Sequence, residues 1–141
     1  MKVHNHFYIN GQWATPSQAA TIDVINPANE QIIGQVALAN SDDVHNAVTA
    51  ARNAFASWSQ TSAEVRANYI RAIAEKMASR SDEMTQLVTA EMGAPLGFSQ
   101  EVQVEDPIDA LAKHADFTAL VDETKKIDQV TVTKEAVGVC A

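Results

Sequence analysis

The chain has 141 residues, 46% of them hydrophobic and 20% charged, which is an ordinary composition for a globular protein of about one domain. Its net charge of −8 argues against a nucleic-acid-binding surface and against an anionic membrane partner, since both attract basic patches. One cysteine cannot form an intrachain disulfide, no apolar run approaches roughly 18 residues, and the first residues lack the apolar core of a secretory signal. We therefore expect a cytoplasmic protein without a membrane span.

Short strands joined by tight turns are expected over the first forty residues. Asn10-Gly11 divides the stretch 7–13 and is the strongest short signal for a β-hairpin, because both residues tolerate positive φ. A second strand is expected at residues 22–25, where Asn26-Pro27 ends the apolar alternation. Another apolar stretch occupies residues 31–38. We interpret the region as a β-hairpin and a small antiparallel sheet.

Three helices are expected next from their caps and their apolar periodicity. They extend from the N-cap Ser41 to Trp58, from the capping box at residues 61–64 to Met77, and from Ser81 to Gly93. Asp42 and Asp43 suit the positive end of the first helix dipole. Gly93 suits the left-handed conformation that often ends a helix, and Pro95 follows it closely.

A fourth helical region is expected at residues 99–120, with an interruption at Asp106-Pro107. Proline lacks an amide hydrogen, so it best fits the first turn of a helix that resumes there. The charged residues 121–129 are expected to form a loop. The β-branched residues that follow, Val130, Val132, Val137 and Val139, predict a terminal strand that is buried on both faces of a larger sheet.

The apolar faces of these helices need a common surface, because isolated helices of this length are marginal in water. The helices could pack on one another as a self-contained bundle, or on a sheet supplied by further chain. The terminal strand favours the second arrangement, since a strand buried on both faces needs neighbours for its backbone groups. We therefore interpret the chain as the opening section of a longer protein.

No complete active site is expected within the chain, which has neither a phosphate-binding glycine motif nor a Ser-His-Asp spacing. Cys140 follows an apolar stretch, and we interpret it as a buried structural thiol. His4 and His6 lack a nearby cysteine or carboxylate partner, so we assign them to a mobile N-terminus and not to a metal site. Glu91 lies at the negative end of the third helix dipole, where an acid is tolerated if it is solvated or beside a bound cation.

Several short motifs occur in a fixed order along the chain. They are Tyr8-Ile9-Asn10-Gly11-Gln12-Trp13, Val24-Ile25-Asn26-Pro27-Ala28-Asn29-Glu30, Ala50-Ala51-Arg52, Glu91-Met92-Gly93-Ala94-Pro95-Leu96 and Lys134-Glu135-Ala136-Val137-Gly138-Val139. In this order and at these spacings they resemble the N-terminal part of the NAD(P)-dependent aldehyde dehydrogenase superfamily. The resemblance covers nearly the whole chain.

The resemblance implies an α/β fold with a nucleotide-binding domain, a catalytic domain and a β-rich bridging segment used in oligomerisation. Residues 1–141 would form one partial N-terminal region of that fold, with no internal domain boundary. An N-terminal hairpin or small antiparallel sheet, about four α-helices and a terminal β segment would supply the scaffold of the cofactor domain and the start of the bridging segment.

The family reaction implies NAD or NADP as the cofactor of the full-length parent and an aldehyde, oxidised to a carboxylic acid, as its substrate. The family's nucleophilic cysteine, its glutamate base and the asparagine that stabilises the oxyanion all lie beyond the positions that match residue 141. We therefore expect no catalytic and no cofactor-binding residue here, no activity from this chain alone, and no nucleophilic role for Cys140.

One family site carries over residue by residue. Some members bind a monovalent cation, K⁺ or Na⁺, through backbone oxygens before an Asn-Pro pair and through an acid that precedes a glycine. The matching positions are Val24 and Ile25, through their backbone, and Glu91, through its carboxylate. Some of those members have aspartate where this chain has Glu91, so the ligand lengths differ.

Two function classes remain open from the sequence. In the first, the partner of this chain is the remainder of the same enzyme, and the 141 residues are scaffold. In the second, the chain is a finished, non-catalytic structural or interaction domain that hides its apolar faces by self-association or by docking to a partner subunit. A finished domain should unfold cooperatively, whereas an orphaned fragment should expose apolar surface.

Overall fold

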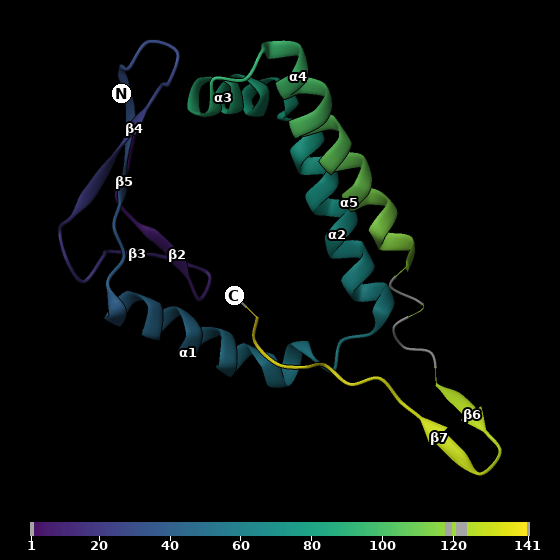
Figure 1. The fold of residues 1–141 in the computed structure, drawn as a ribbon. Coiled ribbons are helices and arrows are strands. Elements are labelled where there is room, and N and C mark those ends of the chain that lie inside the picture. Colours follow the sequence, from purple (N-terminus) through teal and green to yellow (C-terminus); the bar gives the residue numbers. More distant parts are fainter. Residues whose placement is uncertain (1, 118–119, 121–123, 141) are drawn as a thin grey trace. The chain divides into compact units, whose positions relative to one another are not determined.

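The computed structural model describes residues 2–117, 120 and 124–140, and these residues form two compact units (Figure 1). The first unit contains the described residues up to Trp58, together with Ala90–Gly93 and the described residues from Gly138 onward. The second unit contains Ser59–Thr89 and the described residues between Ala94 and Val137. Strands and helices both occur, so the architecture is α/β as the sequence predicts.

The first unit contains a three-stranded sheet with β5 at its centre. β5 (Ile32–Ala37) pairs antiparallel with β4 (Thr21–Ile25), which confirms the small antiparallel pair expected from the sequence. β1 (Lys2–His4) pairs with the other edge of β5 in the parallel sense, and the strand order is β1-β5-β4. The sequence predicts a mobile N-terminus, whereas the structure places His4 in register with Val36. The long connection between β1 and β5 permits this parallel pairing.

A separate hairpin is formed by β2 (Phe7–Ile9) and β3 (Gln12–Ala14), as predicted. Its turn residues Asn10 and Gly11 have φ values of 53° and 75°, the left-handed conformations that match the twist of a hairpin. Tyr8 and Trp13 face each other in register, and their rings meet edge to face with centroids 5.2 Å apart. This cross-strand aromatic pair stabilises the two-stranded sheet.

Helix α1 (Ser41–Trp58) begins at Ser41, the residue predicted as its cap, because Asn40 and not Ser41 performs the capping. The Asn40 Oδ1 atom accepts hydrogen bonds from the amides of Asp42 and Asp43, each at 3.0 Å. In return, Asp43 Oδ2 accepts a 3.1 Å hydrogen bond from the Asn40 amide. This reciprocal pair satisfies amides at the helix start that otherwise lack a partner.

The Asp43 carboxylate also binds the loop before β4. Its Oδ1 atom accepts hydrogen bonds from the hydroxyl of Ser17 at 2.6 Å and from the Ser17 amide at 2.9 Å. Asp43 is only 5% exposed, and these bonds hold the pKa of its carboxyl below the ordinary value; the Ser17 hydroxyl makes the largest contribution. One charged side chain therefore ties the loop to the start of α1.

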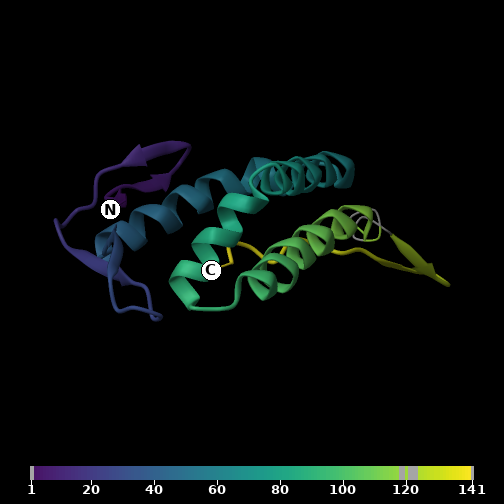
Figure 2. The same ribbon diagram turned by 90° about the horizontal axis from the view of Figure 1, so that it is seen from above.

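The second unit is mainly helical and contains α2 (Ala63–Ala78), most of α3 (Ser81–Met92), α4 (Leu96–Gln100) and α5 (Asp106–Phe117). Ser62 caps α2 by accepting a 3.3 Å hydrogen bond from the Val65 amide, so the cap lies one residue later than the predicted capping box from Thr61 to Glu64 would place it. The views in Figures 1 and 2 both show α2 and α5 running alongside each other. Arg71 on α2 lies 3.6 Å from Asp116 on α5 and 3.3 Å from Glu64.

A π-helical segment, η1 (Glu101–Glu105), joins α4 to α5 without the break that the sequence suggests at Asp106-Pro107. Pro107 lies in the first turn of α5, as expected. The Asp106 amide donates to the carbonyl of Glu101, five residues earlier, so the helix is locally wider. A proline in a regular α-helix clashes with the carbonyl four residues before it, and the wider turn lets the helical path continue.

The hydrophobic core of the second unit is small. Val104 on η1 is fully buried and packs in a cluster with Ala74 and Ile108. Partly buried side chains from α2, α3 and α5 pack against this cluster, namely Met77, Met84, Val88 and Leu111. The π-helical segment thus places its valine between the helices that surround it.

The last described residues form a second hairpin and an irregular tail. β6 (Lys125–Ile127) pairs antiparallel with β7 (Val130–Val132), so the expected loop at 121–129 is wrong for residues 125–127, while residues 121–123 lie outside the described part. Residues 133–140 have no regular secondary structure, and Val137 is 93% exposed. The predicted terminal strand is confirmed at Val130 and Val132, which lie in the exposed strand β7. It is wrong at Val137 and Val139, because among the described residues no strand lies beside them to bond their backbone.

Among the described residues, none of the helices combines the length and the apolar character needed to cross a bilayer.

Truncating Val104 tests the core of the second unit. Val104→Ala should lower the free energy of unfolding by about 2 kcal/mol, because it removes two methylene equivalents from a fully buried side chain and leaves a cavity. Val102→Ala is the matched control, since Val102 lies in the same π-helical segment but is 39% exposed, and it should change stability by less than about 0.5 kcal/mol. Urea denaturation of both variants measures the difference, and equal losses would contradict this core.

Acidification tests the Asp43 contacts. Because the folded-state pKa of Asp43 lies below its unfolded value, its stabilisation is present above the unfolded pKa of about 4 and is lost as the pH falls through the folded pKa. Asp43→Asn should therefore lower the thermal midpoint at neutral pH, and the difference from the parent chain should shrink as the pH falls below 4. Asp42→Asn, on the neighbouring exposed acid, should show a much smaller pH-dependent difference.

Candidate functional site

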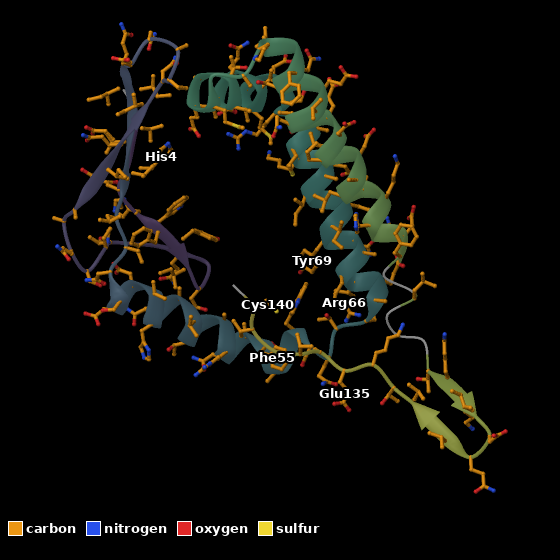
Figure 3. The ribbon with its side chains drawn as sticks, viewed as in Figure 1. His4, Phe55, Arg66, Tyr69, Glu135 and Cys140 are labelled. Atoms are coloured by element: carbon orange, nitrogen blue, oxygen red, sulfur yellow. The ribbon has the colours of Figure 1, made fainter. Side chains whose placement is uncertain are left out.

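Among the described residues, no hydrogen bond joins Cys140 to a histidine or a carboxylate. Cys140 is exposed, with its Sγ atom 3.9 Å from the carbonyl of Gly138, so the prediction of a buried thiol is wrong. Burial would have required the terminal strand to include Val137 and Val139, where it does not form. His4 lies on β1, far from Cys140 in Figure 3. Among the described residues, no group of three or more histidine, cysteine, aspartate or glutamate side chains gathers in a way that could hold a metal ion.

Two further histidines, His6 and His114, contact residues close to them in the sequence. His6 lies 2.7 Å from the side chain of its neighbour Asn5. His114 lies 2.6 Å from the carbonyl of Ala110 within α5, and its ring meets that of Phe117 edge to face. Neither imidazole approaches a nucleophile, so neither contact forms a catalytic pair.

Perturbed ionisable groups often mark active sites, but here they belong to structural contacts. The pKa of Asp43 is lowered by the hydrogen bonds that cap α1 and bind Ser17. The pKa of Arg80 is raised by its two hydrogen bonds to Glu83, at 2.8 and 2.9 Å on the exposed surface of α3. Both shifts are explained by folding contacts and neither indicates a reacting group.

The three residues of the candidate cation site lie on two elements. Val24 and Ile25 end β4, and Glu91 lies in the last turn of α3. The ladder between β4 and β5 shifts register between Val24 and Ile25, where Ile33 is the extra residue on β5. Such a bulge disrupts the regular hydrogen bonding of the strands. The Glu91 side chain is exposed and forms no hydrogen bond or ion pair with another described residue.

A close contact brings these two elements together. Gly93 ends α3 with a φ of 73°, as predicted, and a Cβ atom built on it would lie 2.8 Å from Cγ of Pro27. Pro27 is two residues beyond Ile25, and Gly93 is two residues beyond Glu91. Residues 90–93 accordingly belong to the same compact unit as β4. The two segments of the candidate site therefore meet at their ends, and oxygen atoms are the ligands that alkali cations accept.

The sequence predicts Gly93 as a helix end but gives no sign of its contact with Pro27. A positive φ is a local property that glycine signals directly. The approach of a proline ring 66 residues earlier in the chain depends on tertiary packing. The Asn40-x-x-Asp43 capping pair was also missed, although its spacing is readable as a capping box.

A cavity of about 360 Å³ lies beside α1, within the first unit. Val48, Arg52 and Phe55 of α1 line it together with Gly138 and Val139 of the terminal segment. The lining is mainly apolar, and Arg52 forms no ion pair with another described residue. None of these five lining residues is a nucleophile or a general base.

Comparison with known sequences identifies one family along the chain. The sequence profile described as "Aldehyde dehydrogenase family" matches residues 13–141. A 3-succinoylsemialdehyde-pyridine dehydrogenase from Pseudomonas is 36% identical over 146 aligned residues, which cover 99% of this chain and 30% of that protein. The chain thus spans about 30% of the length of the curated relatives that it matches.

Comparison with solved structures gives the same family. The crystal structure of an aldehyde dehydrogenase from Bartonella henselae matches 92% of this chain and 27% of its own length, with a TM-score of 0.85 and 27% identity. A mutant of aldehyde dehydrogenase C from Pseudomonas syringae, solved in complex with NAD⁺ and octanal, matches 87% of this chain and 25% of its own length. Its TM-score is 0.83 and its identity 37%.

Proposed function

Since the chain belongs to the aldehyde dehydrogenase family, we propose that it is the N-terminal portion of an enzyme that oxidises an aldehyde to a carboxylic acid with NAD or NADP. Within that enzyme its role is scaffolding of the cofactor domain, and by itself it is non-catalytic. The observation that carries this proposal is the match of 99% of the chain to only 30% of a related dehydrogenase. Residues 1–141 are then one partial region of a larger cytoplasmic enzyme.

The exposed apolar side chains support a scaffolding role. Many large hydrophobic residues are exposed, among them Val44 on α1, Val65 and Ile73 on α2, Leu87 and Met92 on α3, and Ile127, Val130 and Val132 on the β6–β7 hairpin. Monomeric globular proteins rarely leave so much apolar helix surface in water. In the proposed enzyme, further polypeptide covers these faces, which is why the helices carry more apolar surface than their small shared core buries.

The chemistry of the reaction is assigned to groups outside the described residues. In the proposed parent enzyme, NAD(P) would supply the hydride acceptor when bound. The only thiol of the sequence, Cys140, has no base in contact within the part of the chain that the structure describes. A thiol without a base or another source of a lowered pKa is a weak nucleophile at neutral pH. We therefore propose that this chain positions and supports the reacting groups and contributes none of them.

We further propose that the backbone oxygens of Val24 and Ile25 and the Glu91 carboxylate contribute to a K⁺ or Na⁺ site. The bulge at the end of β4 and the unpartnered Glu91 carboxylate fit this donor set. The last turn of α3 has no basic residue, so the carboxylate and the helix dipole add negative charge at the same end. A bound cation would offset that charge and join the strand to the helix.

Turnover by the isolated chain tests the non-catalytic proposal. The 141-residue chain, mixed with NAD⁺ or NADP⁺ and octanal, should form no reduced nicotinamide above the rate without protein, because the reacting groups are absent. Absorbance of the reduced cofactor measures this, and Cys140→Ser provides the control for adventitious thiol chemistry. Turnover that survives extensive purification and is abolished by Cys140→Ser would overturn the proposal.

The scaffolding proposal also predicts how the isolated chain behaves in solution. It should bind a hydrophobic dye and elute as oligomers, because its apolar helix faces lack their cover. Dye fluorescence and size-exclusion chromatography measure these properties. A monomeric chain that binds no dye and melts in one sharp, reversible transition would instead support a finished interaction domain.

Salt identity tests the cation proposal. At constant ionic strength, replacing choline chloride with KCl or NaCl should raise the thermal midpoint of the parent chain, because a ligand that binds only the folded state stabilises it. Glu91→Gln should abolish this difference. Glu83→Gln, a substitution on the same helix outside the proposed site, should preserve the cation-dependent difference, and equal loss in both variants would contradict the assignment.

A further inference from the structure

We infer that the contact between Gly93 and Pro27 is the joint that positions Glu91 beside the end of β4. Gly93 and Pro27 are thus positioning residues for the cation site, although neither is among its proposed ligands. This inference rests on the proposed cation role of Glu91, but the joint itself concerns the placement of α3's last turn and is measurable without a cation.

The contact leaves room for no side chain at position 93. A Cβ atom there would meet three carbons of the Pro27 ring, at 2.8 Å from Cγ, 3.7 Å from Cβ and 3.9 Å from Cδ. Gly93 also has a φ of 73°, which disfavours any residue with a Cβ. Two separate constraints therefore act at this position, one from backbone conformation and one from the neighbouring ring.

The Pro27 side of the joint is held by a hydrogen-bonded turn. The Asn26 amide donates to the carbonyl of Gln31 at 2.9 Å, and the Glu30 amide donates to the carbonyl of Asn26 at 2.8 Å. The Asn26 side chain accepts a further 2.9 Å bond from the Ala28 amide. Proline has a fixed φ, so its ring is held in place by this turn. A displacement of Gly93 therefore cannot be absorbed easily by Pro27.

Electrostatics explain why such a joint is needed. Glu91 and the free carbonyls at the end of α3 are negative, and no basic residue lies in that turn. The carbonyl groups at the end of β4 carry the same sign of partial charge. Without a steric joint, these groups would favour separation in the absence of a cation. The fit of Gly93 against the proline ring holds them near one another before an ion binds.

The test uses substitutions that separate the two constraints. Gly93→Asn adds a Cβ atom at position 93. Because asparagine tolerates positive φ, the main effect of the substitution is the collision with Pro27. Gly11→Asn is the matched control, because Gly11 has a φ of 75° and nothing lies within 4 Å of the place that a Cβ atom would occupy there. Combining Gly93→Asn with Pro27→Ala removes the Cγ atom that collides. Pro27→Ala alone removes the ring and leaves the glycine.

The first readout is the amide NMR spectrum without added alkali cation. Gly93→Asn should shift the signals of Ile25 and Glu91, the double variant should return them toward their parent positions, and Gly11→Asn should leave them unchanged. Pro27→Ala alone should also shift the Glu91 signal, which keeps the inference testable if Gly93→Asn does not fold. If the amide signals of Ile25 and Glu91 do not move in Gly93→Asn, or do not move in Pro27→Ala, the inference that this contact positions Glu91 is wrong.

The second readout is the NMR line width of the sodium ion, which broadens when the ion binds. Gly93→Asn should weaken Na⁺ binding roughly tenfold, and the added Pro27→Ala should recover most of this loss. If the sodium line width is the same for the parent chain and for Glu91→Gln, the proposed cation role of Glu91 is wrong. The amide signals still test the contact between Gly93 and Pro27 in that case. Sodium binding that Gly93→Asn leaves unchanged would overturn the positioning role.

Discussion

The first unit depends on the carboxylate of Asp43. Among the described residues of this unit, no large hydrophobic side chain is buried, and the hydrophobic cluster of the chain lies in the second unit. Asp43 instead joins the start of α1 to the loop at Ser17 through hydrogen bonds to a charged acceptor, which are stronger than neutral ones. Where apolar burial is small, such a buried and fully bonded carboxylate determines how a helix meets its strands.

The shortage of buried apolar surface also explains why scaffolding is the function that fits this chain. Its helices have apolar faces, yet the described residues bury only the small cluster around Val104 and, besides it, Ala63, Ala67 and Ala115. A helix face of this kind stabilises a protein only when another surface covers it. The relatives are more than three times as long as the chain, and the proposed enzyme supplies such a surface from its remaining polypeptide.

Glycine has a different role at each of two positions with nearly equal φ. Gly11 makes the hairpin turn possible and has open space around it. Gly93 ends α3 and also admits the ring of Pro27, so its missing side chain serves both conformation and packing. The second role connects a helix end to a strand end, and it places the candidate site at the meeting point of segments far apart in the chain.

Local patterns in the sequence predicted most of the elements. The Asn10-Gly11 turn and the end of α3 at Gly93 are properties of a few neighbouring residues, and the structure confirms them. The start of α2 is likewise predicted to within one residue of its cap, Ser62. The order of family motifs also predicted the aldehyde dehydrogenase family, which the profile match confirms. The turn and cap signals can be read from the sequence because backbone conformation and capping depend on residues within one turn of the chain.

Local sequence patterns did not predict the contacts between distant segments. The parallel pairing of β1 with β5, the bond from Ser17 to Asp43 and the fit of Gly93 against Pro27 each join residues more than 25 positions apart. The valines at 137 and 139 favoured a strand by propensity, but a strand forms only where a neighbour bonds its backbone. The sequence by itself thus determined the family and the local elements, and only the tertiary structure decided which of these elements meet, because meeting depends on packing and pairing partners that no local window contains.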